Sequence, residues 1–176
     1  MRYRPLRGTF EDILARLEAL DYRAALVGPE GSGKSTLLED LRNAAAQQGR
    51  KTRLVFVNDT CPLDAPRRRQ LLCEATANEV VFLDGADSLR WATWLLIKRR
   101  LLHETAGLVI TSHRSGMLPT LLECSTTPLL LQQIVAALGP EAPPVSTGLL
   151  NDLYHRHDGN LRHCLRDLYD LYAQHA

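Results

Sequence analysis

One stretch decides the fold of this chain: Gly28-Pro29-Glu30-Gly31-Ser32-Gly33-Lys34-Ser35-Thr36. It matches the pattern G-x-x-x-x-G-K-[ST] at every fixed position. The apolar run 24–27 comes directly before it and predicts a buried parallel strand. A helical pattern with apolar residues at positions 37, 38 and 41 comes directly after it. The sequence therefore predicts a strand, a glycine-rich loop and a helix, which is the context in which this motif binds phosphate.

The residue types of this loop explain how it would hold an anion. Successive backbone N–H groups form an anion-binding nest, and the helix N-terminus adds its partial positive charge. We expect Lys34 to reach the β- and γ-phosphates of a nucleotide and the Ser35 hydroxyl to ligate Mg²⁺. Here the sequence resembles the P-loop NTPases. The resemblance implies a nucleotide cofactor, ATP with Mg²⁺, bound by Gly28, Pro29, Glu30, Gly31, Ser32, Gly33, Lys34, Ser35 and Thr36.

Length and composition exclude several classes of protein. A chain of 176 residues with 45% hydrophobic residues is long enough for one domain with a real core. The net charge of +1 gives no global field that would attract nucleic acid or a membrane. The 4 cysteines show no C-x-x-C spacing, and no apolar leader or membrane span is evident, so we expect a cytoplasmic protein with reduced thiols and no membrane partner.

A second motif lies at residues 80–84, where Val80-Val81-Phe82-Leu83 is followed by Asp84. An apolar strand that ends in aspartate is the Walker B pattern, whose carboxylate holds Mg²⁺, usually through water. Many ATPases have a glutamate directly afterwards that activates water, but here that position is Gly85. Asp87 and Glu104 are the candidates to replace it, although Asp87 is expected first as the N-cap of a helix over 88–103. Hydrolysis is therefore expected to be slow or to need a partner.

Polar residues also follow the apolar strand predicted at 108–110. Thr111 or Ser112 resembles the sensor-1 position of AAA+ proteins, and His113 resembles the switch histidine of ABC ATPases. A residue at either position would hydrogen-bond phosphate or the attacking water. Together with Lys34 and Asp84 of the two motifs, Thr111 and His113 are therefore the expected catalytic residues. The alternative for His113 is a turn histidine with its hydrogen bonds satisfied. Arg114 is expected to be a surface residue rather than an arginine finger.

The remaining pattern of strands alternating with helices predicts an α/β fold with a central parallel sheet. Its resemblance to AAA+-like ATPases covers most of the chain and implies a three-layer P-loop NTPase fold with five strands and a small C-terminal helical lid. We expect a nucleotide-binding core over 1–139 and the lid over 140–176, divided at a linker rich in proline. Gly159-Asn160-Leu161-Arg162 resembles the sensor-2 region, which makes Arg162 a candidate phosphate contact or else a surface arginine.

Three functions fit these motifs. The first is a Mg²⁺-dependent ATPase that switches a partner, either a protein or DNA, through movement of the lid. The second is a small-molecule or nucleotide kinase that uses the same loop, and the third is a nucleotide-dependent binding module that scarcely hydrolyses. Oligomer formation stays open, and the basic triplets 67–69 and 98–100 are weak indications of nucleic-acid binding.

Overall fold

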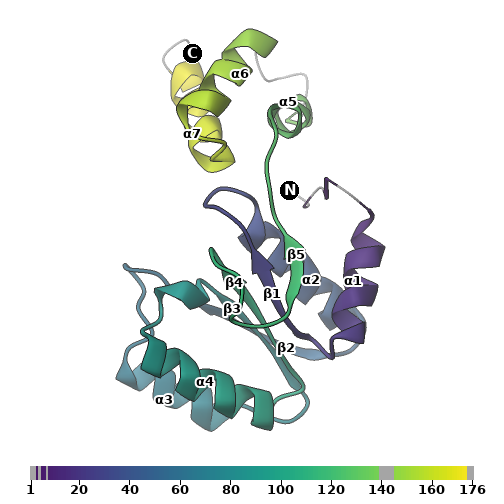
Figure 1. Ribbon diagram of the computed structural model, residues 1–176, viewed down its shortest axis with the longest axis vertical. Coiled ribbons are helices and arrows are strands. Elements are labelled where there is room, and N and C mark those ends of the chain that lie inside the picture. Colours follow the sequence, from purple (N-terminus) through teal and green to yellow (C-terminus); the bar gives the residue numbers. More distant parts are fainter. Residues whose placement is uncertain (1–2, 4, 7, 139–144, 174–176) are drawn as a thin grey trace. The chain divides into compact units, whose positions relative to one another are not determined.

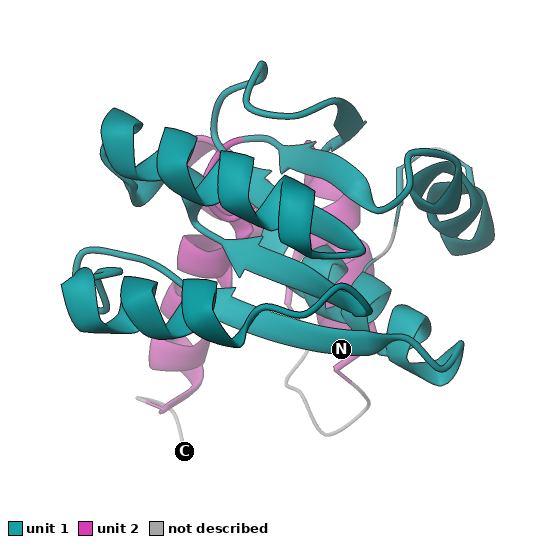
Figure 2. Cartoon of the chain, turned by 90° about the horizontal axis from the view of Figure 1, so that it is seen from below, with its two compact units in different colours: residues 1–28, 34–123 teal, residues 29–33, 124–176 magenta. Residues whose placement is uncertain are grey.

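The structure is a computed structural model that describes residues 3, 5–6, 8–138 and 145–173. The chain divides into two compact units, which Figure 2 shows in different colours. The first unit contains residues 1–28 and 34–123, and the second contains residues 29–33 and 124–176. The glycine-rich loop is thus grouped with the C-terminal part of the chain, whereas both of its flanking elements belong to the first unit.

The first unit is built on a parallel sheet of five strands in the order β2-β3-β4-β1-β5 (Figure 1). The strands are β1 Arg23–Val27, β2 Lys51–Phe56, β3 Glu79–Asp84, β4 Gly107–Ser112 and β5 Thr120–Glu123. Strand β4 therefore lies between the strand that leads into the loop and the strand that ends in the Walker B aspartate. The predicted α/β fold with a five-stranded parallel sheet is confirmed.

Helices cover both faces of this sheet and make three layers (Figure 1). They are α1 Phe10–Ala19, α2 Lys34–Gln47, α3 Ala65–Glu74 and α4 Trp91–Glu104, with a short 3₁₀ helix, η1, at Ala86–Ser88. Helix α2 packs against β1 to β4, α1 lies beside β5, and α3 packs with α4, which contacts β4. In the described part of the chain, no helix has both the length and the apolar character needed to cross a membrane.

Burial follows directly from the covered sheet. Every residue of β3 and of β4 is buried, as expected for central parallel strands with helices on both faces. Along β1, Ala25 and Val27 belong to the core under α3 and α4, so Ala24 and Leu26 face the opposite layer. The apolar run before the loop is therefore buried because helices cover the strand on both faces.

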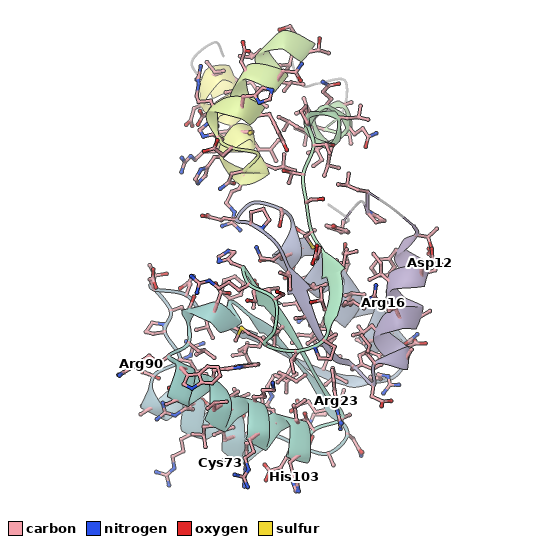
Figure 3. The ribbon with its side chains drawn as sticks, in the orientation of Figure 1. Asp12, Arg16, Arg23, Cys73, Arg90 and His103 are labelled. Atoms are coloured by element: carbon pink, nitrogen blue, oxygen red, sulfur yellow. The ribbon has the colours of Figure 1, made fainter. Side chains whose placement is uncertain are left out.

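Helix α1 begins where its sequence predicts. The Thr9 hydroxyl accepts a hydrogen bond from the backbone N–H of Asp12, and the Asp12 carboxylate accepts one from the backbone N–H of Thr9. The backbone N–H and the hydroxyl of Thr9 both donate to the Asp12 carboxylate and lower its pKa; Figure 3 labels Asp12 at the start of the helix. A threonine followed three residues later by an acidic residue is the sequence pattern of such a cap, so the start of this helix is set locally.

The second unit contains three helices, α5 Pro128–Ala136, α6 Thr147–Arg156 and α7 Leu161–Ala173. They share one apolar core, to which α5 contributes Leu131, α6 Leu153 and α7 Cys164. The expected boundary at 139/140 falls inside this unit, and residues 139–144 lie outside the described residues. Helix α5 buries its apolar side chains against α6 and α7, and the division into a core over 1–139 and a lid over 140–176 stays a prediction.

Two of the four leucines of α4 offer a test of its packing on the sheet. Leu101 is fully buried against the sheet, whereas Leu96 on the same helix is 51% exposed. We expect Leu101→Ala to lower the free energy of unfolding by about 2–5 kcal/mol, because it leaves a cavity in the core. Leu96→Ala should change it by less than about 0.5 kcal/mol. Urea unfolding followed by circular dichroism measures both, and equal effects would contradict the packing of α4 on the sheet.

Candidate functional site

The two ends of the glycine-rich loop meet at the carboxyl end of β1. The backbone N–H of Gly28 donates to the carbonyl of Ser112 at 3.2 Å, which ties the start of the loop to the end of β4. Lys34, the first residue of α2, is 9% exposed, and its Nζ donates to the carbonyl of Gly28 at 2.7 Å. The ammonium group therefore reaches back across the loop to its first residue, and Ser35 follows it, half-buried, in the first turn of α2.

Residues 29–33 of the loop pack within the second unit. Gly31 and Gly33 have φ angles of +73° and +84°, which side chains other than glycine rarely adopt. A Cβ on Gly31 would collide with the side chain of Asn160 and would lie 3.0 Å from its Cα. The Asn160 side chain also accepts a hydrogen bond from the backbone N–H of His163 at the start of α7. Asn160 therefore joins the loop to α7, a contact that the sequence analysis missed.

The Walker B aspartate is held at the end of β3. Asp84 is 6% exposed, and its Oδ1 accepts a hydrogen bond from the Thr111 hydroxyl at 2.5 Å. The same hydroxyl accepts a hydrogen bond from the backbone N–H of Gly85 at 2.7 Å. One threonine on β4 thus orients both the carboxylate and the peptide that follows it.

The residues after β4 form a tight turn. The Ser112 hydroxyl donates to the carbonyl of Arg114 at 2.8 Å and accepts from its backbone N–H at 3.0 Å. This turn presents His113, whose Nδ1 lies 2.7 Å from Asp87 Oδ2. Arg114 is exposed. His113 is therefore paired across the strand ends, which fits the turn histidine with satisfied hydrogen bonds, and its contact with phosphate or water stays a prediction.

The expected N-cap role of Asp87 is wrong. Asp87 lies within η1, and α4 begins three residues later than expected, after an N-cap at Arg90 that makes no side-chain cap bond. Gly85, in the left-handed conformation, turns the chain into η1, and Leu89 and Arg90 are then extended. The Asp87 carboxylate consequently pairs with His113 instead of a helix terminus.

Glu104 lies at the opposite end of the sheet from Asp84. It ends α4 and pairs with Arg100 at 2.8 Å, and β4 begins at Gly107 directly afterwards. Arg23, the first residue of β1, is paired with Leu108 there. Figure 3 labels Arg23 and His103, the neighbour of Glu104, in this region. Glu104 is therefore excluded as a substitute for the missing glutamate.

The lid places its candidate residue on a short turn. Arg162 is exposed in the first turn of α7, three residues after Gly159, whose φ is +78°. The Gly159 carbonyl accepts a hydrogen bond from the Thr126 hydroxyl at 2.8 Å, which fixes the start of α7 to the segment before α5. The structure thus defines the position of Arg162 within the lid, and its contact with phosphate stays a prediction.

The oxygen donors present fit Mg²⁺. Among the described residues, no group of three or more histidine, cysteine, aspartate or glutamate side chains could hold a metal ion. Mg²⁺ is usually bound by one or two protein oxygens together with substrate phosphates and waters, rather than by an all-protein cage. The Asp84 carboxylate and the Ser35 hydroxyl are donors of that kind.

The first residue of each basic triplet donates to backbone carbonyls of the first unit. Arg67 donates to the carbonyls of Phe56, Cys61 and Pro62, and the Lys98 ammonium donates to the carbonyl of Met117 at 2.7 Å.

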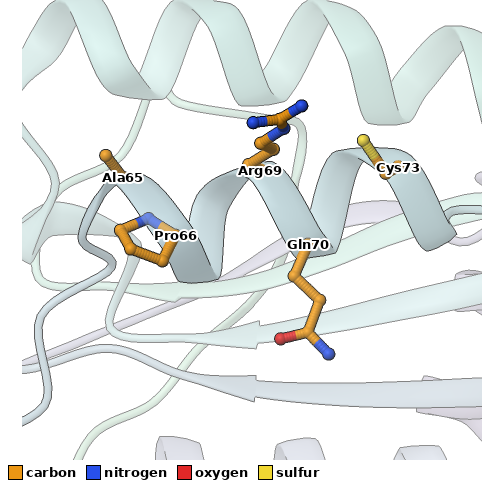
Figure 4. A pocket seen from close by; sticks show the side chains of 5 residues that line it. All are labelled: Ala65, Pro66, Arg69, Gln70 and Cys73. Atoms are coloured by element: carbon orange, nitrogen blue, oxygen red, sulfur yellow. The ribbon is translucent and has the colours of Figure 1, made fainter.

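A hollow of about 580 Å³ runs along α3 (Figure 4). Its lining side chains all come from that one helix: Ala65, Pro66, Arg69, Gln70 and Cys73. None of its lining residues belongs to the motifs.

Thr111 offers a test of the site that needs no ligand. Thr111→Val should lower the free energy of unfolding by about 1–3 kcal/mol, because the buried Asp84 carboxylate and the Gly85 N–H each lose a partner. Thr111→Ser keeps the hydroxyl and should cost clearly less. Urea denaturation of both variants checks this, and a valine variant as stable as the wild type would contradict the role of the hydroxyl.

Comparisons with known proteins agree with this geometry at the level of the fold. No family model and no curated protein sequence matches the chain. Among solved structures, the RuvB Holliday junction branch migration motor of Thermotoga maritima matches with a TM-score of 0.61 and 20% identity over 90% of this chain and 59% of that chain. A DNA replication initiation factor matches with a TM-score of 0.65 and 15% identity over 93% of this chain and 59% of that one.

AMPPCP-bound DnaA from Aquifex aeolicus matches with a TM-score of 0.55 and 16% identity over 88% of this chain and 57% of that chain. The chain thus spans about three fifths of the length of these structures. Identities this low carry information on the fold rather than on the activity. These neighbours are AAA+ P-loop ATPases, and the chain has the fold of the AAA+ P-loop ATPases.

Proposed function

We propose that this protein binds ATP with Mg²⁺ at the carboxyl end of its sheet and hydrolyses the nucleotide. The observation that carries the proposal is the buried carboxylate of Asp84 at the end of β3. Thr111 orients this carboxylate from β4, the strand next to β1, which leads into the loop. In parallel sheets of this kind, ligands bind outside the carboxyl ends of the strands. The glycine-rich loop, which would bind phosphate, and the Asp84 carboxylate, which would bind the metal, therefore both lie at the end of the sheet where a nucleotide is expected.

Lys34 and Ser35 supply the phosphate and metal contacts in this proposal. The Lys34 ammonium, which donates to the carbonyl of Gly28, would exchange that partner for the β- and γ-phosphates. Ser35 and Asp84 would hold the metal, which neutralises the charge that develops on the phosphates. Thr111 keeps the Asp84 carboxylate in place throughout.

The lid would report the state of the nucleotide to a partner. Asn160 touches Gly31 of the loop and binds the start of α7, so phosphate bound in the loop bears on the same residue that positions that helix. We propose that Arg162, exposed in the first turn of α7, contacts the γ-phosphate, and that a protein or DNA partner responds to α7. The four free cysteines accord with the cytoplasmic location that we infer.

We keep two other functions as alternatives, because Gly85 stands where many ATPases have the glutamate that activates water. A kinase transfers the γ-phosphate to an acceptor and needs no residue that activates water, and a binding module needs no turnover. Phosphate release from ATP separates the three functions. Release without an acceptor supports the ATPase, release of ADP only with an acceptor supports the kinase, and binding without release supports the module.

Two substitutions test the proposed site. Lys34→Ala should abolish tight ATP binding, because the loop loses its only side-chain cation. Asp84→Asn should retain ATP binding within about threefold and should lose Mg²⁺-dependent phosphate release, because the neutral amide cannot hold the metal. Calorimetry of ATP binding and a phosphate-release assay, each with and without DNA, measure these effects. Normal turnover by the Asp84→Asn protein would refute the Walker B assignment.

A further inference from the structure

The glycine after the Walker B aspartate is required by packing. Gly85 has a φ of +86°, and a Cβ at this position would collide with the carbonyl oxygen of Val57. The two backbones are held together there, because the Val57 N–H donates to the carbonyl of Asp84 at 2.9 Å. No glutamate fits at position 85, so a carboxylate that activates water must come from another position.

Asp87 is the next carboxylate along the chain, and it has a defined orientation. It lies in η1, which packs against β4, and its side chain is 25% exposed. Its Oδ2 lies 2.7 Å from Nδ1 of His113, whose own side chain is 52% exposed. The two side chains are thus partly exposed to solvent, and their backbones belong to η1 and to the turn after β4.

The register of the sheet places this pair beside the start of the loop. Ser112, the residue before His113, is paired with Val27, and its carbonyl accepts the N–H of Gly28. Asp87 follows β3 by three residues, and β3 is the other neighbour of β4. The pair therefore spans the ends of β3 and β4, next to the Asp84–Thr111 hydrogen bond.

Three other carboxylates of the first unit lie away from the ends of β3 and β4. Asp64 caps α3 by accepting the backbone N–H of Arg67 at 3.1 Å. Glu104 is bound to Arg100 at the amino end of the sheet. Asp59 follows β2, the outermost strand on its side of the sheet. Asp87 alone among these four joins the ends of the two central strands.

We propose that Asp87 accepts the proton of the attacking water in ATP hydrolysis and that His113 is the positioning residue that aims its carboxylate. The inference rests on the proposed ATPase function. The water oxygen forms a bond to the γ-phosphorus while the bond from that phosphorus to the bridging oxygen breaks, and the electron pair of that bond leaves with ADP. The water proton passes to the Asp87 carboxylate and from there to solvent, so that ATP and water give ADP and phosphate.

Asp87→Asn separates chemistry from binding. The substitution keeps the size of the side chain and removes its basicity, so kcat for phosphate release should fall by about 10²–10⁴. The Kd for ATP with Mg²⁺ should stay within about threefold. Glu104→Gln is the matched control, since it removes a carboxylate at the far end of the sheet, and it should leave kcat unchanged.

Two changes at His113 test its positioning role. His113→Asn keeps a nitrogen donor near the position of Nδ1 and should retain most of kcat, whereas His113→Ala should lower kcat about tenfold with little change in KM. A merely structural role would move the unfolding midpoint of both variants and would not be rescued by asparagine. Equal losses in the two variants would overturn the positioning role.

The outcomes of these experiments distinguish a failure of the Asp87 role from a failure of the ATPase function. A wild-type protein that releases phosphate in a Lys34-dependent way, together with an Asp87→Asn variant of unchanged kcat, would overturn the inference and leave the ATPase function standing. A loss in Glu104→Gln as large as in Asp87→Asn would also overturn it. A wild-type protein that binds ATP but releases no phosphate would overturn the ATPase function itself, and the role of Asp87 with it.

Discussion

The position of β4 between β1 and β3 is the constraint on which the rest of the site depends. Because the strands are parallel, their carboxyl ends meet at one edge, and the pairing of Val27 with Ser112 brings the start of the loop to the end of β4. Thr111, one residue earlier on β4, then faces Asp84 on β3 and holds its carboxylate. A strand order without β4 between β1 and β3 would separate the loop from these side chains.

Close backbone packing has a chemical consequence at the end of β3. The close approach of Gly85 to Val57 excludes a side chain from the position where many ATPases carry a carboxylate, and Gly85 turns the chain into η1. The same turn brings Asp87 to His113. A constraint of packing thus removes one candidate base and orients another, which connects the fold of the β3–α4 segment to the proposed hydrolysis.

Local signals in the sequence predicted the elements well because their causes are local. The caps at Thr9 and Thr127 depend on a hydroxyl and a backbone N–H three residues away, and both are present in the structure. The apolar strands were recognisable because both faces of the sheet are covered. The start of α4 was misplaced because the left-handed Gly85 is set by contact with Val57, a residue distant in the sequence.

The sequence by itself determined the motif, the alternation of strands and helices, and the identity of the residues that could bind phosphate and metal, because these depend on residue types at short spacing. The tertiary structure alone decided that Asp87 pairs with His113 and that Asn160 touches Gly31. Those facts depend on strand order and on contacts between residues far apart in the chain, and spacing along a sequence carries no information about either.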